Sequence, residues 1–137
     1  MKRILVLLPK SIAGRLIIES FASGFEANKC RVLIKDVENL IKEDVEKFSP
    51  DKVFGYDYSY LMDENAKKII KELNCKNHVF YFADEPQSKF ALGDKKELYE
   101  ELKNIDAKIF IWDKDFLCDF KNSFYLFVQL VTVGDDC

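Results

Sequence analysis

The stretch Ile4-Leu5-Val6-Leu7-Leu8 decides the fold of this 137-residue chain. Five apolar residues in succession make a strand that is apolar on both faces, and Pro9 ends it. Such a strand is typical of a parallel sheet covered by helices, because a sheet with one solvated face alternates apolar and polar residues. The stretch therefore predicts an α/β fold with this strand buried near the centre of its sheet.

Similar apolar runs recur along the chain and alternate with helical patterns. The expected strands are 4–8, 31–34, 53–56, 78–83, 109–112 and 124–130, and the expected helices are 13–28, 37–48, 63–73 and 94–102. This alternation is typical of successive βαβ units. We expect one Rossmann-like domain over residues 1–137, with a doubly wound, mostly parallel six-stranded sheet in the order 3-2-1-4-5-6 and helices on both faces.

The composition argues against several classes of function. The net charge is −3 and no block of Lys or Arg stands out, so we expect no nucleic-acid partner. The chain has one histidine, and its four cysteines are scattered, so neither a metal site nor a cofactor is expected. Its longest late apolar stretch, 124–133, is interrupted by Gln129 and is shorter than the ~20 residues of a membrane helix. We expect a cytoplasmic protein without a membrane span.

Ligands of open parallel sheets bind beyond the carboxyl ends of the strands, which directs attention to the loops there. The loop after the first strand contains Lys10 and Ser11, which could hold an anion at the start of the following helix. The alternative, that Ser11 only caps the helix, is the stronger interpretation. The loop has a single glycine, Gly14, so it matches neither a dinucleotide fingerprint nor a phosphate-binding P-loop.

The third strand leads into an alternation of tyrosines with small or polar residues, Gly55-Tyr56-Asp57-Tyr58-Ser59-Tyr60. If the strand continues, its period of two places the tyrosines on one side, where rings could stack on a sugar or base. Asp57, Tyr58 and Tyr60 are therefore candidate substrate-binding residues. The favoured alternative is that Tyr56 is a core residue and the other two tyrosines cover a loop.

Two further acidic segments follow strands. Asp84 and Glu85 come directly after the fourth strand, and Pro86 restricts the backbone beside them. Asp84 is the candidate catalytic base and Glu85 a candidate substrate ligand, and an ordinary turn or cap acid is an equally good interpretation. Asp113 repeats the arrangement after the fifth strand and is a weaker candidate for substrate binding.

These segments carry a family resemblance that spans essentially the whole chain through short motifs. The matching stretches are Arg3–Leu7, Ser49–Phe54, Val79–Pro86, Ile109–Asp113 and Tyr125–Leu130. The chain resembles the N-terminal, Rossmann-like half of GT-B glycosyltransferases, in particular the CgeB-like, spore-maturation type of glycosyltransferase-like protein. That family usually has a proline after the last Tyr-Leu, where Phe127 stands here.

The resemblance implies an acceptor-side domain that binds a sugar or glycan acceptor. In that family the nucleotide-sugar site lies mainly in a second domain. The implied partner is therefore a second Rossmann-like domain or a partner chain, and this chain is not expected to be catalytic alone.

A second hypothesis is a degenerate receiver-like signalling or protein-interaction module of flavodoxin-like topology. It would use Asp57 after the third strand and Lys114 after the fifth. An active receiver holds Mg²⁺ with acidic residues after its first strand, where this chain has Lys10, whose positive charge would repel the metal. The sequence therefore predicts that such a module would not accept a phosphoryl group.

Overall fold

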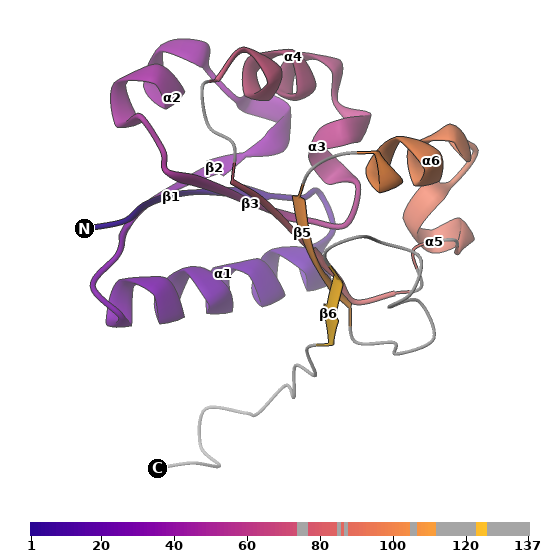
Figure 1. Cartoon of the computed structure of the whole chain (residues 1–137), viewed down its shortest axis with the longest axis horizontal. Helices are drawn as coiled ribbons and strands as arrows, with labels where there is room; N and C mark the ends of the chain where they lie inside the picture. The colour runs from indigo at the N-terminus through magenta and orange to yellow at the C-terminus, as the bar shows by residue number, and fades with distance from the viewer. Residues whose placement is uncertain (74–76, 85, 87, 105–106, 112–122, 126–137) are drawn as a thin grey trace.

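The chain forms a parallel sheet with helices on both faces (Figure 1). The computed structural model describes residues 1–73, 77–84, 86, 88–104, 107–111 and 123–125. Its strands are β1 (Arg3–Leu8), β2 (Arg31–Asp36), β3 (Lys52–Tyr56), β4 (His78–Phe82), β5 (Ala107–Ile111) and β6 (Ser123–Tyr125). Its helices are α1 (Ile12–Ala27), the 3-10 helix η1 (Val37–Asn39), α2 (Lys42–Phe48), α3 (Ser59–Met62), α4 (Glu64–Glu72), α5 (Lys89–Leu92) and α6 (Glu97–Lys103).

The strands lie in the order β2-β1-β3-β4-β5-β6, and every neighbouring pair is parallel. The prediction of a parallel α/β sheet is confirmed, whereas the order 3-2-1-4-5-6 is wrong. The structure places β3 next to β1, with Ile4 opposite Lys52, so that β2 forms the edge. Burial explains the choice, because β3 is buried from Val53 to Tyr56 whereas no residue of β2 is fully buried.

The observed order has a simple relation to the predicted one. Deleting the outermost strand 3 from 3-2-1-4-5-6 and renumbering the rest gives 2-1-3-4-5, which is the observed order without β6 at its edge. The order 2-1-3-4-5 is also that of flavodoxin-like folds. In this order the chain leaves β1 and β3 toward opposite faces of the sheet, whereas in the predicted order it does so at β1 and the fourth strand. The fold is therefore compatible with both hypotheses drawn from the sequence, and it moves the expected ligand crevice to the gap between β1 and β3.

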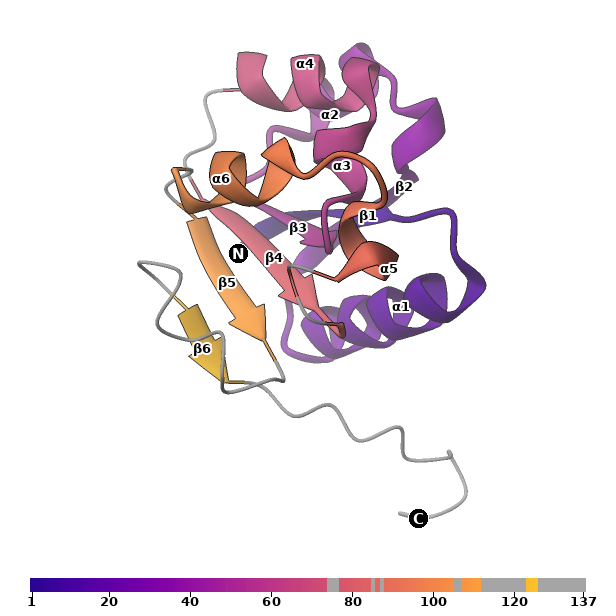
Figure 2. The same cartoon turned by 90° about the vertical axis from the view of Figure 1, so that its right-hand side faces the viewer.

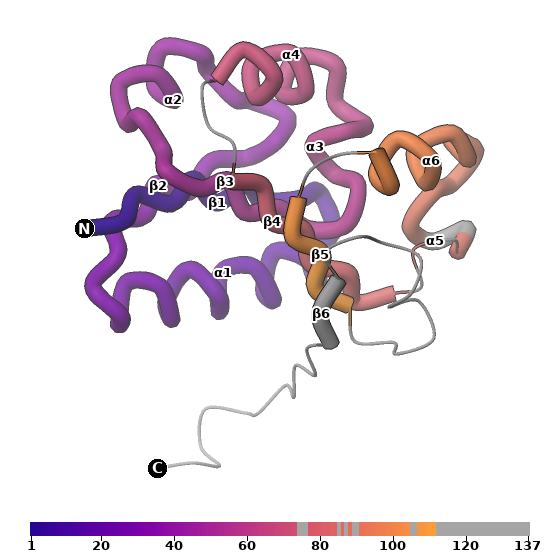
Figure 3. Tube along the Cα trace, in the orientation of Figure 1, coloured from indigo at the N-terminus to yellow at the C-terminus, as the bar shows by residue number. Residues whose placement is uncertain are grey.

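The two faces of the sheet are covered differently. Helix α1 packs on one face, where Ile18 and Ala22 meet Val6 and Phe54. Helices α2 to α6 lie on the other face, as Figures 2 and 3 show. The core of that second face is built on Leu5, Leu7, Val53, Phe80 and Phe82. Both Ile4–Leu8 and the apolar residues of β4 are buried, as their sequence predicts.

Local signals placed several elements correctly and missed others. Asp63, the first residue of the expected helix 63–73, caps α4, since its carboxylate accepts a hydrogen bond from the Ala66 N–H at 2.9 Å. The expected helix 37–48 is split into η1 and α2, and α5 forms between the expected strand 78–83 and the expected helix 94–102. The expected helix 94–102 begins later, as α6, and Lys96 holds its N-cap position without a side-chain bond. The part of the expected last strand after Tyr125 lies outside the described residues.

Candidate functional site

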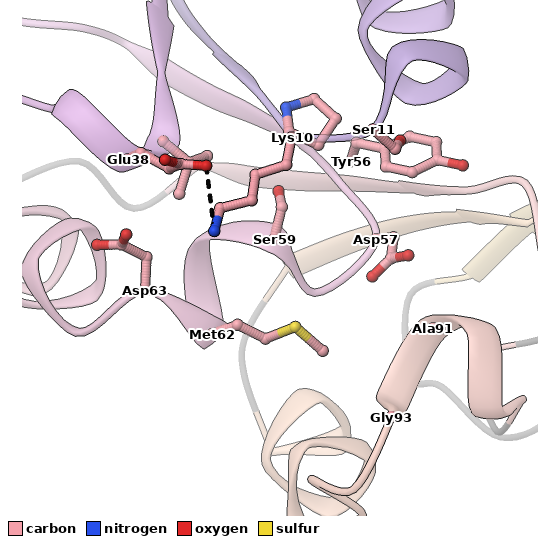
Figure 4. A pocket seen from close by; sticks show the side chains of 12 residues that line it. Lys10, Ser11, Glu38, Tyr56, Asp57, Ser59, Met62, Asp63, Ala91 and Gly93 are labelled. Atoms are coloured by element: carbon pink, nitrogen blue, oxygen red, sulfur yellow. Dashed lines mark ion pairs between the residues drawn. The ribbon is translucent and has the colours of Figure 1, made fainter.

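A pocket of about 490 Å³ opens at the carboxyl ends of β1 and β3 (Figure 4). It lies at this point because β1 leads into α1 on one face of the sheet and β3 leads into α3 on the other, which leaves a crevice between the two loops. We refer to it as the β1/β3 pocket. Its lining residues are Pro9, Lys10, Ser11, Val37, Glu38, Tyr56, Asp57, Ser59, Met62, Asp63, Ala91 and Gly93.

Asp57 is the residue on which the chemistry of the pocket depends. It follows β3 directly and adopts the left-handed conformation, with φ 51°, which aspartate tolerates better than most residues. Its N–H donates to the Tyr81 carbonyl at 2.7 Å, and its carboxylate accepts a hydrogen bond from the Tyr58 N–H. Burial raises the pKa of Asp57 from 3.8 to about 7; the Tyr58 N–H opposes this rise and the negative charge of Asp84 adds to it. The carboxyl can therefore both take up and release a proton near neutral pH.

The wall beside Asp57 is built by Tyr56 and the first turn of α1. Burial raises the pKa of Tyr56 to about 12, and the charges of Asp57 and Asp84 add to this effect, so its hydroxyl stays protonated. A Cβ at Gly14 would lie 3.0 Å from the Tyr56 ring and 2.5 Å from the Ser11 Oγ. The one glycine of this loop thus serves close packing between α1 and β3.

Ser11 acts as the N-cap of α1. Its Oγ accepts a hydrogen bond from the Gly14 N–H at 3.1 Å, which is the capping interpretation favoured by the sequence. Lys10 is exposed and forms an ion pair with Glu38 at 3.3 Å across the pocket. The lysine therefore brings a positive charge to the pocket, although Glu38 of η1 already offsets it.

Ser59 was not identified from the sequence as a site residue. Its Oγ is buried at the pocket and has no hydrogen-bond partner among the described residues. A buried hydroxyl without a partner loses hydrogen bonds that it would make in water, so a ligand that supplies one is favoured there. The sequence signal was hidden because the alternation of tyrosines suggested a continuing strand, whereas Ser59 begins α3.

The tyrosines after β3 lie in the core rather than in the pocket. Tyr58 is fully buried, and its hydroxyl donates to the Pro86 carbonyl at 2.6 Å. Tyr60 stacks on Phe80 with ring centroids 5.0 Å apart. Neither ring lines the pocket, because the left-handed turn at Asp57 ends the strand and the period of two ends with it. This placement gives Tyr58 and Tyr60 no contact with a ligand in the pocket, and it differs from the alternative as well, because both rings lie in the core instead of covering a loop and Tyr56 lines the pocket.

The remaining predicted residues differ in what the structure says of them. Asp84, the predicted catalytic residue, is exposed and does not line the pocket, yet its charge raises the pKa of both Tyr56 and Asp57. Glu85 and Asp113 lie outside the described residues. Within the described part of the chain, no three His, Cys, Asp or Glu side chains are arranged to hold a metal ion, and no helix is long and apolar enough to cross a membrane.

Comparison with known proteins leaves the site to be interpreted from its own geometry. No protein-family model, no curated protein and no solved structure matches this chain. The arrangement of Asp57, Ser59 and Lys10 offers one proton-exchanging carboxyl, one hydroxyl without a partner and one cation around a partly apolar space. Such a site suits a small, neutral ligand with several hydroxyl groups.

Proposed function

We propose that this chain is the acceptor-binding domain of a glycosyltransferase-like protein and that the β1/β3 pocket binds the hydroxyl groups of a sugar acceptor. The observation that carries the proposal is Asp57, a partly buried carboxyl at the carboxyl end of β3 with a pKa of about 7. A carboxylate accepts hydrogen bonds from sugar hydroxyls, and a pKa near the ambient pH suits a proton acceptor. The pocket volume also lies within the ~300–1,000 Å³ range of small-molecule sites.

In the transfer reaction that we propose, Asp57 rather than Asp84 takes the proton of the acceptor hydroxyl. The acceptor oxygen forms a bond to the anomeric carbon of a donor sugar as the bond from that carbon to its leaving group breaks. The donor is held by a second Rossmann-like domain or a partner chain. Asp84 raises the proton affinity of Asp57 through its charge, so its contribution is to set the pKa of the base.

A binding experiment tests the proposal without requiring the second domain. Saturation-transfer NMR with a panel of neutral mono- and disaccharides at pH 7 should detect binding to the unaltered chain. Asp57→Asn should weaken binding by about tenfold, the size expected for one charge-assisted hydrogen bond. Asp44→Asn is the matched control, because Asp44 lies outside the pocket in a surface ion pair with Lys35. Absence of binding by every sugar, or equal binding by Asp57→Asn, would refute the proposal.

The same hypothesis predicts weak recognition of donors. The first loop lacks a glycine-rich phosphate cradle, and the space beside Gly14 is filled by Pro9, Ser11 and Tyr56. Calorimetric titration with UDP-, GDP- and ADP-sugars should therefore show no micromolar binding to the chain alone. Micromolar binding together with turnover would mean that the chain is a complete enzyme.

A second candidate function is the degenerate receiver-like interaction module. The specific observation in its favour is the flavodoxin-like sheet order with Asp57 directly after β3. Lys10 stands where a receiver needs a metal-binding acid, and it is paired with Glu38. Incubation with Mg²⁺ and acetyl phosphate should therefore give no phosphoryl adduct by intact mass. A stoichiometric adduct that is absent in Asp57→Asn would place this function first.

A further inference from the structure

Ser59 is a second polar side chain that the segment after β3 brings to the β1/β3 pocket. Asp57 ends the strand and Ser59 begins α3, and both residues line the pocket (Figure 4). The Oγ of Ser59 is buried and has no hydrogen-bond partner among the described residues. The proposed function uses the carboxyl of Asp57 and leaves this hydroxyl without a role.

The residues on either side of Ser59 fix its position. Tyr58 is fully buried, and its hydroxyl donates to the Pro86 carbonyl at 2.6 Å. Tyr60 is also buried, and its ring stacks on Phe80 with ring centroids 5.0 Å apart. Because both tyrosines are held in the core, the backbone at Ser59 cannot shift without disturbing them. The two rings therefore hold the Ser59 hydroxyl in place before a ligand arrives, which lowers the entropy lost on binding.

The charges of the lining indicate what kind of group Ser59 meets. Among the described lining residues there are three carboxyl groups, those of Glu38, Asp57 and Asp63, and one ammonium group, that of Lys10. The ammonium group is already paired with Glu38 at 3.3 Å. A phosphate or carboxylate on the ligand would therefore be repelled by the carboxylates of the lining. A ligand hydroxyl, which both donates and accepts hydrogen bonds, is the partner that suits Ser59.

Met62 adds an apolar contact next to the Ser59 hydroxyl. It is three residues further along α3, so the two side chains lie on the same face of that helix, and both line the pocket. Val37 adds apolar area to the same lining. A sugar ring also has both kinds of group, since its C–H groups can pack on apolar side chains while its hydroxyls form hydrogen bonds.

A single carboxyl accepts a hydrogen bond from any hydroxyl of a sugar, so Asp57 alone does not select one of them. We propose that Ser59 decides which hydroxyl of the acceptor sugar lies at Asp57, because it binds a second hydroxyl of the same ring. This role rests on the proposed function, since it requires that the pocket binds a sugar acceptor. Its consequence is positional specificity: one oxygen of the acceptor gives its proton to Asp57 and receives the transferred sugar.

Sugars that lack one hydroxyl test this role in the unaltered chain and its variants. The probes are the methyl glycosides of glucose, galactose and mannose and their monodeoxy analogues, with Kd measured by saturation-transfer NMR titration at pH 7. Ser59→Ala should weaken binding of the parent glycoside about fivefold, the size of one neutral hydrogen bond. One deoxy analogue should bind the unaltered chain equally weakly and lose nothing more in Ser59→Ala. A different deoxy analogue should behave in this way with Asp57→Asn.

Two controls show whether Ser59 acts on the ligand or on the fold. Ser20→Ala should leave every Kd unchanged, because Ser20 is exposed on α1, outside the pocket, and donates to the Leu16 carbonyl at 3.0 Å. The urea midpoint of Ser59→Ala should equal or exceed that of the unaltered chain, since alanine removes a buried hydroxyl that has no partner. A clearly lower midpoint would mean that the hydroxyl has a structural role, and it would overturn the proposal.

The binding results also separate the role of Ser59 from the function on which it rests. If no methyl glycoside binds the unaltered chain, both are refuted. If Asp57→Asn weakens binding and Ser59→Ala does not, acceptor binding stands and selection by Ser59 is wrong. Selection by Ser59 is also wrong if both variants couple to the same deoxy position, because the two side chains then contact one hydroxyl instead of two.

Discussion

Asp57→Asn should stabilise the protein at neutral and higher pH while leaving its stability unchanged in acid. The folded state raises the pKa of Asp57 from 3.8 to about 7, so it holds the proton more tightly than the unfolded chain does. Its contribution to stability is therefore fully present below about pH 4 and is lost as the pH rises from about 4 to about 7, because the unfolded chain ionises in this range while the folded state still holds the proton. Above about pH 7 the buried carboxyl is ionised as well, and the loss is complete. Asparagine carries no charge at any pH, so the variant escapes this loss.

The magnitude follows from the same shift. A tenfold change in proton affinity is worth about 1.4 kcal/mol, so the free energy of unfolding gains up to roughly 4 kcal/mol in the variant above pH 7. We expect a measured gain of about 2–4 kcal/mol at pH 8 and less than ~0.5 kcal/mol at pH 4. Asparagine also tolerates the left-handed conformation and offers an oxygen to the Tyr58 N–H, so the substitution introduces no new strain.

Urea denaturation followed by circular dichroism from pH 4 to pH 8.5 measures this difference. Other carboxyl groups titrate equally in both proteins and cancel in the comparison, and Asp44→Asn controls for the loss of a surface charge. A difference that stays constant across the pH range, or a variant that is less stable at pH 8, would refute the reasoning. Asp57 would then be ionised in the fold at little cost, and it would be a poor proton acceptor.

Three further substitutions test the packing around the site by denaturant titration. Gly14→Ala should lower the free energy of unfolding by ~1–3 kcal/mol, because its Cβ would lie 2.5 Å from the capping hydroxyl of Ser11. Gly24→Ala has open space around it and should raise the free energy of unfolding by up to ~1 kcal/mol. Equal effects of the two substitutions would contradict this packing. Phe80→Ala should cost ~3–5 kcal/mol and half-buried Phe110→Ala clearly less, and the reverse ranking would mean that the core is misplaced. Asp63→Ala should cost ~1 kcal/mol by removing the cap of α4, and no loss would show that the cap is dispensable.

The strands were predictable because each carries its own signal. The runs at Ile4–Leu8 and 53–56 are apolar throughout, and the structure buries both. The strand order was not predictable in the same way, since it depends on which side of β1 the third strand joins. A hint was present in β2, where Arg31, Lys35 and Asp36 suit the edge of a sheet better than its interior.

The candidate site was predicted in its position but only partly in its residues. The carboxyl ends of β1 and β3 do form a pocket, and Lys10, Ser11 and Asp57 line it. Tyr58 and Tyr60 were expected in the pocket but lie in the core, because the left-handed conformation of Asp57 ends the strand. The alternation of residue types in the sequence does not reveal a change of conformation at one residue. The raised pKa of Asp57 depends on its burial by segments that are distant in sequence. No local sequence pattern therefore predicts it.

The position of β1 between β2 and β3 has a consequence for how the protein is made. Its two neighbours are supplied by segments that start at Arg31 and Lys52, and neither contact is a local hairpin. Closing such long loops lowers the entropy of the chain before strand pairing offsets the loss. The sheet is therefore expected to fold more slowly than a helical domain of equal size. During synthesis, Ile4–Leu8 is made before both of its neighbours and gains the second only after the chain has grown past Tyr56. Among the described strands, the apolar β1 is therefore the one separated by the longest stretch of chain from the last strand that pairs with it. We expect a chaperone to bind the nascent chain at this strand.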